Sequence, residues 1–507
     1  MGCSNTKERD CSLNKKKTNE VNIIIKVDEN EINKEIFFIS NYTQELPKSN
    51  LKEMNETNTE LYINDTCHKF KRSFTFEKAG KYTIKLRLKF LINNCSYMFY
   101  ECKNILKIDL SNFDTSETTN MSHMFSGCDN LVDINLSNFN TSKTINMSNM
   151  FENCSNLVNI NLSNFDTTKT NNMQSMFRNC SSLVNINLSN FDTNNVTKMS
   201  SMFFKCKKLE SLDLSKFKTI NCKSMSGMFF ECINLNNVNI SNFDTINVND
   251  MSFMFSYCES LKKLDLSHFN TSNCIRMSSI FKSCKSLQEL NISNFNTSKI
   301  NNMEEFFSEC NNLESLDLSN FNTENSKSMK SMFYSCSKIK SLDLSSFNTS
   351  KVENMEKMFQ DCSELTNINV SNFDTKKVTS FNSMFSGCNN LLSIDLSSFT
   401  GEKVLGISDM FYNCQKISTI NLKNFNPINA FYYQKIFSNC INLSELNLSK
   451  FKISKNYPID AKQKYNPIFY IFKNCNKLKR IIIDKEEEIK FKLILEKNEI
   501  YPEILFA

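Results

Sequence analysis

From about residue 94 onward, apolar and polar residues recur along the chain with a period of 26. The repeated unit reads M-x-x-M-F-x-x-C-x-x-L-x-x-[LI]-x-[LIV]-S-x-F-x-T, and its cysteine marks the spacing. Fourteen cysteines keep this interval from Cys102 to Cys440, and Cys475 follows after a longer interval of 35. A period of this length predicts a solenoid in which each repeat forms one coil.

The apolar spacing inside one unit predicts a short strand and several buried columns. Ile134 and Leu136 alternate with a polar residue, so both face the same side of a strand. One such strand cannot bury that side alone. We therefore expect about fifteen coils, stacked at about 4.8 Å, to form a parallel sheet roughly 65–70 Å long. The other apolar columns fill the interior: Met121, Met124, Phe125, Cys128 and Phe139.

The pattern divides the chain into four parts. Residues 1–20 are polar and lack periodicity, which predicts a flexible tail. Residues 21–93 alternate in short β-branched and aromatic bursts, which predicts a small β-rich module that caps the start of the array. Residues 94–483 form the solenoid, and residues 484–507, where the repeat has ended and charge is dense, form a C-terminal cap.

The unit M-F-x-x-C-x-x-L-x-x-[LI]-x-[LIV]-S-x-F resembles the BspA-like leucine-rich-repeat proteins of bacteria and protists over about residues 95–483. The resemblance implies a leucine-rich-repeat solenoid, in a family often described as surface or adhesion proteins. The chain departs from the wider leucine-rich-repeat pattern at a position that often holds Asn. Phe113, Phe139 and Phe165 stand there, so we expect a stacked phenylalanine spine.

The repeated cysteine has a chemical and an architectural interpretation. A catalytic thiol needs a positioned base, but the chain has three histidines (His68, His123 and His268), and none recurs with the repeat. No cysteine pair has the C-x₂-C or C-x₄-C spacing of a zinc site. The cysteines are therefore interpreted as buried packing residues. We predict no catalytic, cofactor-binding or metal-ligating residues.

Two polar rows follow the repeat. The residue between the strand leucines is always Asp or Asn, as at Asp109, Asn135 and Asp213. This row is either a ligand platform or a hydrogen-bonded polar face that keeps the sheet soluble, and the second interpretation is favoured. Thr115 and its counterparts are expected to form hydrogen bonds within turns. Because this face lacks Trp, Tyr and Arg columns, a partner would bind it weakly or by avidity.

The first residues, MGCSNTK, fit the pattern M-G-x-x-x-[ST] for N-myristoylation of Gly2. Cys3 is a candidate for palmitoylation. One myristoyl chain binds membranes only marginally, so a second signal is needed. Acylated Cys3 can provide it, and so can the basic residues of the tail, which are Lys7, Arg9, Lys15, Lys16 and Lys17.

Composition narrows the function classes. The net charge of +6 is small for 507 residues and is not gathered into one basic tract, which argues against nucleic-acid binding. No apolar run is long enough to span a bilayer, and the N-terminus lacks a secretory signal peptide. We therefore expect the chain to stay on the cytosolic side, where thiols are reduced.

Three functional hypotheses follow. The first is a non-enzymatic protein-interaction scaffold, a monomer tethered by acylation to the cytosolic face of a membrane. The second is a secreted or surface-exposed adhesin, as the family resemblance suggests. An enzyme is the third, and no cofactor is expected for any of them.

Overall fold

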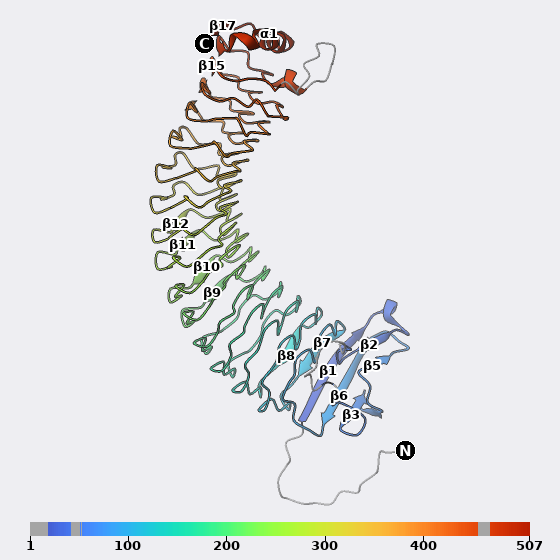
Figure 1. The fold of residues 1–507 in the computed structure, drawn as a ribbon. Coiled ribbons are helices and arrows are strands. Elements are labelled where there is room, and N and C mark those ends of the chain that lie inside the picture. Colours follow the sequence, from blue (N-terminus) through green and yellow to red (C-terminus); the bar gives the residue numbers. More distant parts are fainter. Residues whose placement is uncertain (1–18, 42–50, 52, 455–466) are drawn as a thin grey trace, which may run out of the picture. The chain divides into compact units, whose positions relative to one another are not determined.

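The computed structural model describes residues 19–41, 51, 53–454 and 467–507. The chain forms a parallel β-solenoid of about 15 turns, as the 26-residue period predicts. It divides into two compact units, Met1–Phe243 and Asp244–Ala507. Figure 1 follows the coils of each unit along the sequence.

The N-terminal module is a mostly antiparallel sheet. Its six strands lie in the order β4-β3-β6-β1-β7-β8, and a two-stranded sheet pairs β2 with β5. The predicted module at 21–93 contains most of this sheet, but β1 begins at Asn19, inside the predicted tail. Asn19 is held there because its Nδ2 donates to the carbonyl of Phe90 at 2.8 Å. The module consists of β1 (Asn19–Val27), η1 (Glu29–Glu31), β2 (Glu35–Phe37), β3 (Thr59–Ile63), β4 (Thr66–His68), β5 (Ser73–Thr75) and β6 (Gly80–Leu88).

The module covers the edge of the first coil. Strand β1 pairs antiparallel with β7 (Ile105–Asp109), the first strand of the repeat, and places Ile23 opposite Ile108. Strand β7 then pairs in parallel with β8 (Asp133–Asn135) of the next coil. An open sheet edge exposes unpaired backbone N–H and C=O groups. Because β1 pairs with β7, the first edge of the repeat array is covered.

The strands of the later coils are short, and their ladder is interrupted. Parallel pairs join β9 to β10 in the first unit and β11 to β12 in the second, while β13 to β17 form one sheet. At residues 315–317, 341–343 and 367–369 no strand forms. The expected uninterrupted sheet is thus present only in segments. The strands are β9 (Ser211–Asp213), β10 (Asn237–Asn239), β11 (Lys263–Asp265), β12 (Glu289–Asn291), β13 (Ser393–Asp395), β14 (Thr419–Asn421), β15 (Glu445–Leu448), β16 (Arg480–Ile483) and β17 (Glu503–Phe506).

The coils are joined most regularly at the turn between the first methionine and the cysteine of each unit. In the coil of Met121, every second N–H donates to a carbonyl of the following coil at 2.8–2.9 Å. The intervening N–H groups close turns within their own coil. The donors to the next coil are Met121, His123, Phe125 and Gly127, and the acceptors are Asn146, Ser148, Met150 and Glu152.

Two phenylalanine columns run through the interior. The predicted spine is confirmed, since Phe139 and Phe165 stack with ring centroids 6.1 Å apart and planes 10° apart. A second column comes from the Met-Phe pair, where Phe125 and Phe151 stack at 5.4 Å and 8°. These rings are fully or almost fully buried, and each is worth roughly 1.5–3 kcal/mol of hydrophobic free energy.

The threonine row joins successive coils. The Oγ1 of Thr115 donates to the carbonyl of Asn140 at 2.9 Å and accepts the N–H of the same residue at 2.8 Å. Thr297 holds Asn322 in the same way, at 2.8 Å and 2.9 Å. The hydrogen bonds expected for these hydroxyls are formed, and their partners lie in the next coil. The threonine side chain is buried at the boundary between two coils, where its hydroxyl bonds both the N–H and the C=O of one residue in the next coil.

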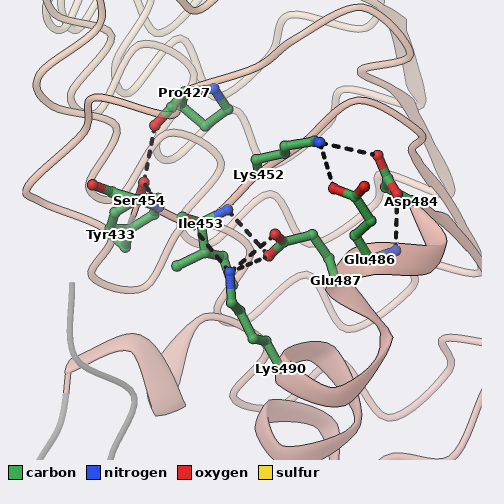
Figure 2. Close-up of polar contacts among 9 residues, drawn as sticks. All are labelled: Pro427, Tyr433, Lys452, Ile453, Ser454, Asp484, Glu486, Glu487 and Lys490. Carbon is green, nitrogen blue, oxygen red and sulfur yellow. Dashed lines mark hydrogen bonds and ion pairs between the residues drawn. The ribbon is translucent and has the colours of Figure 1, made fainter. Parts of the chain in front are cut away.

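The C-terminal elements are fastened to the last coils by polar contacts (Figure 2). Glu487 is 5% exposed, and its carboxylate accepts from Lys490 Nζ at 2.9 Å and from the N–H of Ile453 at 3.4 Å. Strand β17 adds in parallel to β16, and α1 buries Phe491, Ile494 and Leu495. The elements beside these strands are η3 (Pro467–Tyr470), η4 (Lys485–Glu487) and α1 (Glu488–Lys497).

The threonine contacts between coils predict a stability effect. Thr297→Val keeps the shape of the side chain but leaves the N–H and C=O of Asn322 without the hydroxyl of the buried Thr297. We expect the free energy of unfolding to fall by about 1–3 kcal/mol in urea denaturation followed by circular dichroism. The control Ser298→Ala removes a half-buried hydroxyl that donates within its own coil, to Asn296 Oδ1 at 2.7 Å, and should change the free energy of unfolding by less than about 0.5 kcal/mol. Equal effects of the two substitutions would contradict the proposed contact.

Candidate interaction surface

The repeat cysteines are buried and bonded to the backbone. The Sγ of Cys128 donates to the carbonyl of Phe99 in the preceding coil at 3.1 Å, and Cys310 does the same to Phe281 at 3.2 Å. Burial raises the pKa of the Cys180, Cys232 and Cys284 thiols to about 12. A thiol with such a pKa is not a nucleophile near neutral pH. The structure supports the packing interpretation of this residue.

No metal centre emerges from the part of the chain that the structure describes. Among residues 19–41, 51, 53–454 and 467–507, no group of three or more His, Cys, Asp or Glu side chains is arranged to hold a metal ion. The histidines lie apart in the sequence, and each packs against an aromatic ring. His68 lies beside Phe74, His123 beside Tyr97 and His268 beside Phe269.

The Asp/Asn row is engaged in local hydrogen bonds. In the first coil, Asp109 Oδ1 accepts the N–H of Ser111 at 3.0 Å, and Asp213 accepts the N–H of Ser215 at 2.9 Å. Hydrogen bonds from the backbone and hydroxyl of Ser215 lower the pKa of Asp213. The row is therefore a set of turn-forming side chains. It remains exposed and acidic or polar, which favours the second of the two sequence interpretations.

The exposed side of these strands, here called the strand face, is hollowed at its N-terminal end. A cavity of about 520 Å³ lies over β1, β3, β6, β7 and β8. Half-buried Ile24 lines it together with Tyr62, and Lys85, Lys107 and Asp133 bring charge to it. The Nζ of Lys107 lies 3.1 Å from Asp133 Oδ2. An apolar centre with a charged rim is the usual composition of a protein-binding surface.

The second unit has two similar hollows on its own strand face. One of about 510 Å³ includes Lys263 and Glu289, whose charged groups lie 2.6 Å apart. The other, of about 310 Å³, includes Glu445 and Arg480, whose charged groups lie 3.1 Å apart. Charged groups on this face are thus paired across neighbouring coils.

Aromatic side chains gather on the exposed side of the Met-to-Cys turns, here called the turn face. Tyr97 stacks on His123 with centroids 4.5 Å apart, and Phe204 stacks on Phe230 at 4.4 Å. The guanidinium of Arg178 lies 3.9 Å from the centre of Phe204. The consensus of the repeat does not show these aromatic residues, and His123 was considered only as a possible base. The available signal was that Tyr97 and His123 occupy a position where Ser is the commonest residue, and that Phe204 and Phe230 are aromatic in consecutive copies of a variable position.

The predicted lipidation residues Gly2 and Cys3 lie outside the described residues. In the described part of the chain, no helix has the length and apolarity needed to cross a membrane. Acylation of the tail therefore stays a prediction.

Comparison with known proteins identifies the repeats. The model of a family described as "Mycoplasma protein of unknown function, DUF285" matches residues 93–212, 182–290, 276–393, 338–451 and 362–479. No curated protein matches the chain. The specific resemblance to BspA-like proteins stays a prediction.

Two solved structures are similar at low identity. The TLR13–ssRNA13 complex is 16% identical with a TM-score of 0.24, and the match covers 75% of this chain and 62% of that one. The functional domain of InlJ from Listeria monocytogenes, which includes a cysteine ladder, is 13% identical with a TM-score of 0.15, covering 75% and 68%.

The buried thiols predict sensitivity to alkaline pH. Their pKa is higher in the folded than in the unfolded chain, so their contribution is fully present below about pH 8.5 and is lost as pH rises towards 12. At pH 10 each thiol should cost about 2 kcal/mol of stability. Urea denaturation at pH 7.5 and pH 10 measures this loss.

Matched variants test the origin of that pH dependence. Replacing Cys232 and Cys284 together by alanine should reduce the number of protons released on unfolding at pH 10 by about two. Replacing the exposed Cys67 should leave it unchanged. Rapid reaction of the repeat cysteines with a thiol reagent in the native protein would refute their burial.

Proposed function

The chain belongs to the family described as Mycoplasma protein of unknown function, DUF285, and we propose that it is a non-enzymatic scaffold that binds a protein partner along its repeats. The observation that carries the proposal is the hollow over β1, β6, β7 and β8. Half-buried Ile24 and Tyr62 give it an apolar centre, and Lys85, Lys107 and Asp133 give it a charged rim.

Repetition of similar hollows suits a scaffold better than an enzyme. An enzyme needs one site with a base, an acid or a nucleophile brought together. The strand face instead offers shallow hollows in both units, each bordered by paired charges. Such contacts are weak singly, and an extended partner that engages several of them gains affinity through avidity.

Site-specific photo-crosslinking tests this binding surface. A photoreactive phenylalanine at Thr83, which is exposed in the hollow of the strand face, should crosslink a discrete protein partner in cells. The matched control is the same residue at Thr119, which is exposed but does not line the hollow. Crosslinks of equal yield from both positions, or from neither, would count against the strand face as the binding surface.

We further propose that acylation of the tail holds the scaffold on the cytosolic face of a membrane. The support is the co-occurrence of Gly2, Cys3 and five basic residues within the first 17 positions. A myristoyl chain alone gives a binding constant of about 10⁴ M⁻¹, and a second acyl chain or a basic cluster makes the attachment stable.

Membrane fractionation tests the anchor. Gly2→Ala removes the acceptor for the first chain, and we expect most of the protein to move from the membrane pellet to the supernatant. Cys11→Ala changes a tail cysteine outside the motif and should leave the distribution unchanged. A Gly2→Ala protein that stays in the pellet would disprove the anchor, and digestion by protease added to intact cells would favour a surface adhesin.

A further inference from the structure

A small pocket lies on the turn face of the first three coils. It has a volume of about 280 Å³. The first coil contributes Tyr97, Tyr100 and Glu101, the second His123, Ser126 and Gly127, and the third Glu152 and Asn153. All of these residues belong to the first unit. The pocket is separate from the strand face and takes no part in the proposed scaffold function.

Three aromatic rings converge in this pocket. The ring of Tyr97 is stacked on His123, with centroids 4.5 Å apart and planes 14° apart. Tyr100 stands edge-on to both, 5.3 Å from Tyr97 and 6.2 Å from His123. All three side chains are half-buried, so the rings line the pocket and still meet solvent. Aromatic faces arranged at angles to one another are the usual way that proteins bind organic cations.

Two carboxylates supply negative charge. Glu101 is exposed at the pocket, and no described residue forms an ion pair with it. Glu152 is more constrained. Its Oε2 accepts from Asn149 Nδ2 at 2.9 Å and from Ser126 Oγ at 3.4 Å, and its Oε1 lies 3.5 Å from Arg178 Nε. Arg178 offsets the charge of Glu152, so Glu101 is the carboxylate available to a ligand.

His123 contributes a ring without a competing positive charge. Its Nδ1 is buried, has no hydrogen-bond partner among the described residues, and lies 3.9 Å from Glu152 Oε2. Burial lowers the pKa of His123, against the opposing effect of Glu152. The imidazole is therefore neutral near pH 7 and does not repel a cation.

The turns that form the pocket have the same backbone conformation as those of the other coils but different side chains. Tyr97 and His123 have φ of 62° and 56°, a left-handed conformation that is uncommon for residues other than glycine. At the equivalent position most other coils have residues such as Asn149, Ser175 or Ser201. Gly127 completes the pocket wall, because a Cβ there would lie 3.1 Å from Cγ of Glu101.

We propose that this pocket binds an alkylammonium group, held against the rings of Tyr97, Tyr100 and His123 and paired with the carboxylate of Glu101. The volume suits a head group of this size. A cation attracted by ring faces and by a carboxylate gains from both contacts, whereas a neutral group of the same shape gains from neither. The group can come from a free or lipid-borne choline or from a methylated lysine side chain.

Calorimetric titration of the full chain with choline tests the site. Its neutral isostere, 3,3-dimethylbutan-1-ol, has the same shape without the charge. We expect choline to bind about tenfold more tightly than the isostere. Trimethyl-lysine amide is titrated in parallel, and the tighter of the two cations identifies the source of the group. Equal affinity for choline and its isostere, or no binding of either cation, would overturn the proposal.

Matched variants locate the binding. Tyr97→Asn introduces a residue that Asn149 shows to be compatible with the left-handed turn, and we expect it to weaken choline binding about tenfold. Glu101→Gln should weaken it several-fold and reduce its dependence on salt. Ser383→Asn introduces the same residue at the equivalent left-handed position of a coil in the second unit and should leave binding unchanged. Unchanged binding by Tyr97→Asn would place any choline site elsewhere.

Discussion

The stack of coils depends on the alternating backbone hydrogen bonds of the Met-to-Cys turn. Every second N–H of this turn reaches the next coil, and the others close turns in their own coil. The alternation requires two residues per coil in the left-handed region, such as Asn149 and Asn153, with φ of 57° and 59°. Asparagine tolerates this region better than most residues. Most coils nevertheless have other residues there, such as Ser175, Glu305 and Lys357, so the hydrogen bonds to the next coil hold the turn in this conformation without glycine.

The side-chain columns follow from that backbone. Because each turn repeats the one before it, Phe125 lies over Phe151 with their planes 8° apart, and Cys128 reaches the carbonyl of Phe99. That carbonyl also accepts the N–H of Cys102 in its own coil. The thiol is thus a second donor to a group that is already paired, and it fills a narrow space beside the aromatic column. A role that every coil needs explains why every coil has the cysteine.

The periodicity predicts burial well and bonding partners poorly. Phe139, Met121 and Cys128 were assigned to the interior from spacing alone, and all three are buried. Spacing reports which side of the chain faces the core. It does not report which backbone group a polar side chain will meet, so a hydrogen bond could be predicted for Thr115 but not that its partner lies in the next coil. Likewise, the three-residue strands are interrupted because the turn holds the coils together without them.

The same reasoning separates structural from functional residues on a repeat protein. Cys128, Thr115 and Asp109 recur, and each has a bond that the architecture needs. A ligand site needs residues that differ from the repeat, since a feature shared by all coils cannot mark one place. Tyr97 and His123 are such departures, and stacking brings them together although they are 26 positions apart. A consensus sequence omits such residues, so they are recognised only when the sequences and positions of neighbouring coils are compared.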